Sequence, residues 1–117
     1  MKIALDYDKC YNLDRTFWNK VVDVANDLGH EVRIVTYRSP TDDTLSKEQV
    51  REDIPIIYTD GVAKRFHCKW FVDKKSRTEV GWNPDVWIDD RPEVVDNNSV
   101  ATIEILEKWR NSEEYSK

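Results

Sequence analysis

Short apolar segments alternate along this chain with segments of helical periodicity, and two of the apolar segments end directly in paired acidic residues. Lys2–Leu5 is followed by an Asp-Tyr-Asp sequence, and Asp85–Ile88 is followed by two more aspartates. Two further segments of the same kind, Glu31–Thr36 and Ile54–Tyr58, lie between them. Apolar runs of this length, bounded by polar residues, are typical of buried strands. The alternation predicts an α/β fold with a mostly parallel sheet.

The clearest helix is expected after the first strand, where apolar residues recur at three- and four-residue steps and form one stripe: Phe17, Trp18, Val21, Val22, Ala25 and Leu28. Asp14 or Asn12 can cap the start of this helix, and Gly29 is placed to end it. A second helix is expected over Ala63–Phe71, after the third strand.

Two other segments are less regular. A short helix is expected over Leu45–Glu52, because Ser46 and Gln49 have the spacing of a capping box. In Ser99–Arg110 the apolar residues fit one face of a helix, although the β-branched residues also allow a fifth strand. We favour the helix.

Length and charge limit the classes of protein. The chain has 117 residues, so we expect one domain spanning 1–117. Lys and Arg number 18 against 23 Asp and Glu, and a net charge of -5 argues against a general nucleic-acid coat or a binder of anionic membranes. No apolar run is long enough to cross a membrane or to form a signal-peptide core. Two cysteines fit a reducing compartment better than a disulfide scaffold, so a cytoplasmic protein is expected.

The most informative polar residues lie where the expected strands end. Acidic, hydroxyl and ammonium groups should meet there, because function gathers at the carboxyl ends of parallel strands: Asp6, Asp8, Thr36, Lys64, Asp89 and Asp90. Carboxylates crowded together repel one another, so the cluster implies a cation. Oxygen ligands suit Mg²⁺, which often shares its shell with a substrate phosphate.

This set of side chains suits phosphoryl chemistry. Asp6 could attack phosphorus as a carboxylate nucleophile. Asp8 could protonate the leaving oxygen and later activate water. Thr36 and Lys64 could hold phosphate oxygens, the first by a hydrogen bond and the second by its charge.

The same four segments, in the same order, resemble the signature of the haloacid dehalogenase superfamily over residues 3 to about 95. The first motif of that family is an apolar strand followed by Asp-x-Asp, here Asp6–Asp8. The second is a strand-final Thr or Ser, here Thr36, and the third is a Lys at a helix start, here Lys64. The fourth is an apolar strand followed by paired acids, here Asp89-Asp90.

The resemblance implies a Rossmann-like three-layer αβα sandwich of the haloacid dehalogenase type, with no cap domain because the connections that carry caps are short. It implies that Asp6 is the nucleophile and Asp8 the general acid and base. It also implies that Mg²⁺ is held by Asp6, by the backbone carbonyl of Asp8 and by Asp89 or Asp90. The chain departs from the family at Cys10, where Thr or Val is usual.

Substrate class is suggested by a basic segment, Val62–Thr78, in which six cations face one acid and aromatic residues interleave. Together with Tyr37, Arg38 and Arg65 as substrate-binding residues, it favours a nucleotide or a polynucleotide end as the phosphorylated substrate. The simpler interpretation is a helix with one buried and one solvated face.

Several alternatives stay open. The chain could be a catalytically silent binding or regulatory module, or a phosphotransferase. Lys69, Lys74 and Lys75 are substitutes for Lys64 in the third motif, and Asp89-Asp90 could instead cap a following helix. The order of the motifs disfavours a phospho-acceptor receiver domain. Because a capless site is open, a protein partner or self-association could cover it.

Overall fold

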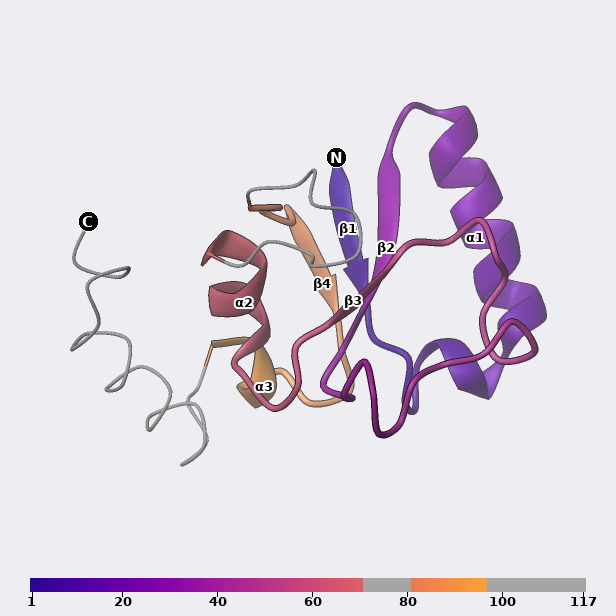
Figure 1. Cartoon of the computed structure of the whole chain (residues 1–117). Helices are drawn as coiled ribbons and strands as arrows, with labels where there is room; N and C mark the ends of the chain where they lie inside the picture. Colours follow the sequence, from indigo (N-terminus) through magenta and orange to yellow (C-terminus); the bar gives the residue numbers. More distant parts are fainter. Residues whose placement is uncertain (71–80, 97–117) are drawn as a thin grey trace, which may run out of the picture.

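The computed structural model describes residues 1–70 and 81–96 of the chain (Figure 1). Its strands form one four-stranded sheet in the order β3-β2-β1-β4. In chain order the elements are β1 (Lys2–Leu5), the 3-10 turn η1 (Tyr11–Leu13), α1 (Arg15–Asp27), β2 (Glu31–Thr36), β3 (Ile56–Tyr58), α2 (Lys64–Trp70), β4 (Val86–Ile88) and α3 (Glu93–Asp96).

All pairs of neighbouring strands are parallel, which confirms the predicted α/β fold with a parallel sheet. Ile3 of the central strand β1 lies opposite Val32 of β2 and Val86 of β4. At the other end of β2, Thr36 lies opposite Tyr58 of β3. The four carboxyl ends therefore share one edge of the sheet.

Helices lie on both faces of the sheet, with α1 on one side of the strands and α2 on the other (Figure 1). Side chains alternate between the faces along each strand. Leu5 and Ile34 belong to the apolar cluster that includes residues of α1, whereas their neighbours Ala4 and Val35 belong to the cluster that includes Cys68 of α2. The result is a Rossmann-like arrangement in which the sheet is the middle layer.

The predicted first helix is confirmed, but its apolar stripe is wider than its buried face. Asp14 is the cap, since its Oδ1 accepts a hydrogen bond from the backbone N–H of Phe17 at 3.0 Å. Gly29 follows the helix with φ +83°, a conformation that favours glycine. Phe17 and Leu28 are exposed rather than buried, because the sheet meets the helix about a quarter turn away from them.

The expectation of a helix over Leu45–Glu52 is wrong, because this segment forms turns. The Ser46–Gln49 pair does form, with Ser46 N–H and Oγ both donating to Gln49 Oε1 at 2.9 and 3.1 Å. Gln49 and Val50 N–H both donate to Ser46 O at 3.0 Å, which closes one turn, but the segment does not continue as a helix beyond it. Arg51 N–H donates to the hydroxyl of Tyr11 at 3.3 Å, and this tertiary contact competes with a helical bond.

The remaining strands and helices are close to prediction. β3 begins two residues later than the predicted Ile54–Tyr58, because Pro55 has no N–H to donate to a neighbouring strand. The segment Ser99–Arg110 and residue Phe71 lie outside the described residues. None of the helices in the described ranges has the length and apolar composition of a membrane-spanning segment.

Candidate functional site

Asp6 is the first residue after β1, and its backbone continues the sheet. Its N–H donates to Ile88 O of β4 at 2.9 Å, and its carbonyl accepts from Tyr11 N–H at 3.1 Å. These two bonds fix the backbone and hold the carboxyl group at the carboxyl edge of the sheet. Only 7% of the residue is exposed. A carboxyl group so far removed from water needs a partner of opposite charge.

Lys64 supplies that charge from the first turn of α2. Its Nζ lies 2.9 Å from Asp6 Oδ1 and 2.5 Å from Asp89 Oδ2. The lysine side chain is 1% exposed, so one cation and two carboxylates form a buried ionic cluster. Lys64 thus brings the predicted first, third and fourth motifs into contact. Lys69, one alternative for the third motif, is exposed on the same helix. Lys74 and Lys75 lie outside the described residues.

Burial raises the pKa of Asp6 to about 7, and Lys64 opposes this rise through its charge and its hydrogen bond. A side-chain hydrogen bond with Asp90 and the negative charge of Asp89 add to the rise in the Asp6 pKa, because the first favours the protonated form and the second disfavours a further negative charge. A carboxyl pKa so far above 3.8 shows that burial and the neighbouring side chains control the ionisation of Asp6. A bound cation would favour the ionised form.

Asp90, rather than Asp89, lies in the group that could hold a metal ion. One ligand atom from each of Asp6, Cys10 and Asp90 lies within 4.8 Å of the others. Asp89 has other partners, since Oδ2 accepts from Lys64 and Oδ1 accepts from the backbone N–H of Arg91 at 2.9 Å. Two carboxylates fit Mg²⁺, which completes its shell with water and favours oxygen over sulfur. Burial raises the pKa of the Cys10 thiol, which further disfavours that sulfur as a ligand.

Asp8 and Arg38, predicted as separate functional residues, are paired with each other. Arg38 Nε and the NH2 nitrogen donate to the two Asp8 carboxylate oxygens at 3.0 and 2.8 Å. The guanidinium carbon also lies 5.1 Å from the centre of the Tyr7 ring. The hydrogen bonds from Arg38 lower the pKa of Asp8, so this carboxyl group is held ionised.

Two threonines stand side by side at this edge, and only one was predicted. Thr36 is fully buried and its Oγ1 accepts from Arg38 N–H at 3.3 Å. Thr59 N–H donates to Thr36 O at 2.8 Å, and the Thr59 side chain is also fully buried. Within the described part of the chain, Thr59 Oγ1 has no hydrogen-bond partner. The sequence signal that could have identified Thr59 is its position directly after β3. Tyr37 follows Thr36 and is partly buried.

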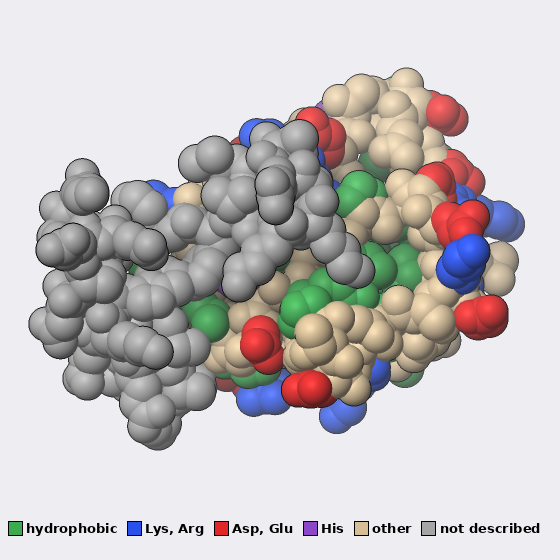
Figure 2. Space-filling view, in the orientation of Figure 1, with side chains coloured by type: hydrophobic (Ala, Val, Ile, Leu, Met, Phe, Trp, Pro, Cys, Tyr) green, Lys and Arg blue, Asp and Glu red, His purple; other side chains and the backbone are tan. Residues whose placement is uncertain are grey.

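Arg65 is not part of this cluster. Its Nε donates to Asp96 of α3 at 2.5 Å, and its guanidinium carbon lies 5.4 Å from the centre of the Trp87 ring. Of the predicted basic segment, Lys64 and Arg65 are therefore both paired with acids, and residues 71–78 lie outside the described residues. On the face shown in Figure 2, basic and acidic side chains are interspersed rather than gathered by sign.

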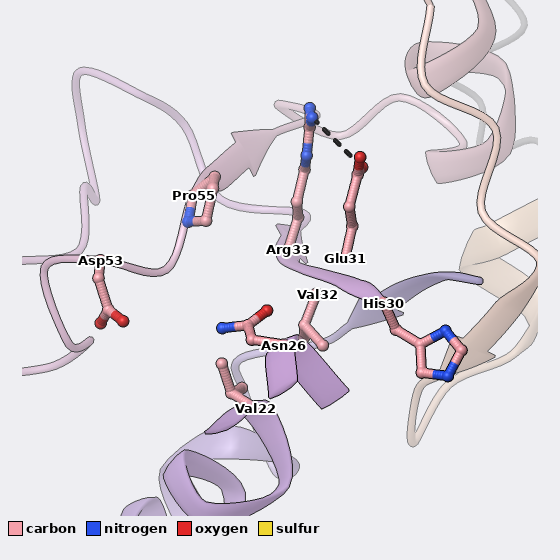
Figure 3. Close-up of a pocket in the computed structure, with 8 residues that line it drawn as sticks. All are labelled: Val22, Asn26, His30, Glu31, Val32, Arg33, Asp53 and Pro55. Carbon is pink, nitrogen blue, oxygen red and sulfur yellow. Dashed lines mark ion pairs between the residues drawn. The ribbon is translucent and has the colours of Figure 1, made fainter. Parts of the chain in front are cut away.

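A shallow pocket of about 220 Å³ lies at the opposite, amino-terminal end of β2 (Figure 3). It is formed by the last turns of α1, the start of β2 and the loop before β3, through Val22, Asn26, His30, Glu31, Val32, Arg33, Asp53 and Pro55. None of the predicted site residues lines it. The candidate site is therefore the ionic cluster at the carboxyl edge.

Comparison of the chain with protein-family models, with curated proteins and with solved structures finds no match. The resemblance to the haloacid dehalogenase superfamily therefore stays a prediction from the sequence.

Proposed function

We propose that the chain is a Mg²⁺-dependent phosphohydrolase of the haloacid dehalogenase type, which cleaves phosphomonoesters through an aspartyl-phosphate on Asp6. The buried Asp6–Lys64–Asp89 cluster, with Asp90 beside it, is the observation that carries this proposal. Burying three charged groups is expensive in free energy and is uncommon without a functional reason. A nucleophile, a cation and a metal-binding carboxylate are the parts that phosphoryl transfer requires.

In the first step a carboxylate oxygen of Asp6 attacks phosphorus, and the bond from phosphorus to the substrate alcohol oxygen breaks. Lys64 holds Asp6 Oδ1, which leaves Oδ2 to attack. A bound Mg²⁺ would supply positive charge against the phosphate oxygens. In the second step water attacks the phosphoryl group, inorganic phosphate leaves and the Asp6 carboxylate is restored.

Competition for the Arg38 guanidinium changes the protonation state of Asp8 during this cycle. When a substrate phosphate arrives, it competes with the Asp8 carboxylate for the Arg38 guanidinium, because both anions suit its paired donors. An Asp8 released from Arg38 regains a higher pKa and can protonate the leaving oxygen. The carboxylate then accepts a proton from the attacking water.

Nucleotides and polynucleotide ends are favoured by the sequence of the basic segment, but Lys64 and Arg65 already have acidic partners. Arg38 is the described cation that we assign to recognition of a larger substrate, because a substrate phosphate can displace Asp8 from its guanidinium.

The test is phosphate release from a panel of nucleotides, phosphorylated oligonucleotide ends and a chromogenic phosphoester, with Mg²⁺ or with EDTA. We expect Mg²⁺-dependent release, which falls to background in Asp6→Asn. The matched control is Asp42→Asn, which changes an exposed aspartate in the loop after β2 and should retain activity. Thermal melts establish that both variants fold.

A catalytically silent binding module is the second candidate, because Asp6 and Asp8 each already have a basic partner in the structure. Under this alternative no substrate releases phosphate, and removing Mg²⁺ changes no property of the chain. Transfer of the phosphoryl group to an added alcohol would instead identify a phosphotransferase.

A further inference from the structure

α1 carries a second apolar stripe besides the face that packs on the sheet. Phe17, Val24 and Leu28 are 53%, 58% and 69% exposed, and Val21 between them is partly buried. Successive spacings of four, three and four residues place these four side chains along one side of the helix. Single exposed apolar residues are ordinary, whereas a continuous row indicates a surface that another protein covers.

We propose that this stripe is covered by a second copy of the chain, whose α1 packs antiparallel against the first. The four-three-four spacing reads the same in both directions along the helix. A two-fold axis between Val21 and Val24 therefore sets Phe17 against Leu28 of the second copy, and Val21 against Val24 of the second copy. The stripe is thus complementary to itself, as an interface between identical chains requires.

The charged residues beside the stripe also favour the antiparallel pairing of the two α1 helices. Lys20 and Asp27 are exposed and lie seven residues apart along the same flank of the stripe. In an antiparallel pair of helices, residues of this flank face the same flank of the partner, so each Lys20 lies beside Asp27 of the other copy. In a parallel pair the flank would face the other flank, where Ala25 offers no charge. Asp23, also exposed, is already paired with Arg51 at 2.7 Å.

The interface should be modest in strength. The 13 residues of α1 span about 20 Å, so the pair forms a short contact that depends on protein concentration. None of the residues of the ionic cluster lies on α1. Failure of this proposal would therefore leave the proposed phosphohydrolase untouched, and the reverse also holds.

Sedimentation velocity over a range of concentrations tests the proposal with the full chain. We expect a concentration-dependent dimer, and we expect Val24→Lys to raise its dissociation constant by at least about tenfold, because both copies would bury an unpaired charge. Phe17→Glu should act in the same way, and circular dichroism shows whether each variant folds. Val86→Lys is the control, because Val86 is an exposed valine on the edge strand β4. A chain that stays monomeric at its highest soluble concentration would overturn the proposal.

Exchange of charges tests the antiparallel arrangement itself. Lys20→Asp and Asp27→Lys should each weaken the dimer several-fold, because each places like charges side by side across the interface. The double variant restores opposite charges and should recover most of the affinity. A double variant that is no stronger than the single variants would contradict the proposed pairing.

Discussion

The Lys64 ammonium nitrogen lies 2.9 Å from the Asp6 carboxylate oxygen Oδ1, and both residues are almost completely buried. The two residues are 58 positions apart in the chain, so the contact joins the end of β1 to the start of α2. This ion pair connects the fold to the proposed chemistry.

Replacing Lys64 should destabilise the fold. In Lys64→Met two carboxyl groups lose their shared cation inside the protein, and breaking a buried pair in this way costs about 3–5 kcal/mol. Urea unfolding at neutral pH measures the free energy of unfolding. Lys69→Met, at an exposed position of the same helix, should change it by less than about 0.5 kcal/mol. Equal effects of the two substitutions would show that the buried pair does not stabilise the fold.

The free energy of unfolding should rise as the pH falls from about 7 to about 4 when divalent cations are absent. The folded-state pKa of Asp6 is raised from 3.8 to about 7, so in this window the folded protein binds a proton that the unfolded chain does not. The slope is at most about 1.4 kcal/mol per pH unit for one group. Asp8, whose pKa is lowered, opposes the trend only below that window. Urea unfolding in EDTA should show a flatter dependence for Asp6→Asn, and an unchanged slope would contradict the assignment.

Removing the Arg38 guanidinium should raise the pKa of Asp8 towards its ordinary value, because two hydrogen bonds to the carboxylate are lost. Carbon NMR of the labelled aspartate carboxyl groups follows this titration directly in Arg38→Gln. Arg51→Gln removes a different guanidinium and should leave the Asp8 resonance unchanged. An Asp8 pKa that is the same with and without Arg38 would show that the pairing does not persist in solution.

Divalent cation binding should require Asp6 and Asp90 but not the Cys10 thiol. Binding of Mn²⁺, followed by electron paramagnetic resonance, should weaken by at least about tenfold in Asp90→Asn, because a hard cation loses one of two carboxylates. Cys10→Ser keeps the site small and polar and should bind with little change. If the cysteine variant loses binding and Asp90→Asn does not, the proposed ligand set is wrong.

Strand ends and helix periodicity were predictable because both are local in the sequence. The runs that end at Leu5 and Ile88 needed only their apolar residues and the aspartates after them, and α1 needed its spacing and its cap at Asp14. The Leu45–Glu52 segment was not predictable in this way. Its conformation depends on the Tyr11 hydroxyl, which approaches from 40 residues away to accept from Arg51 N–H.

The candidate site was likewise predictable from the sequence only in part. That Asp6 and Lys64 would lie at one edge of the sheet followed from the α/β fold, because the carboxyl ends of parallel strands meet there. The choice of partners did not follow, because it is decided by side-chain geometry within loops. Asp8 forms an ion pair with Arg38, and Asp89 forms one with Lys64. Asp90 lies close to Asp6.

The proposed phosphohydrolase mechanism requires that Asp6 becomes phosphorylated during turnover. The most direct measurement is mass spectrometry of the chain after rapid quenching with a phosphoester and Mg²⁺, with the modified residue located in the peptide. We expect one phosphoryl group on Asp6 in the native chain and none in Asp6→Asn or in EDTA. If the chain releases phosphate while Asp6 stays unmodified, with the phosphoryl group on another residue or on none, the proposed mechanism is wrong.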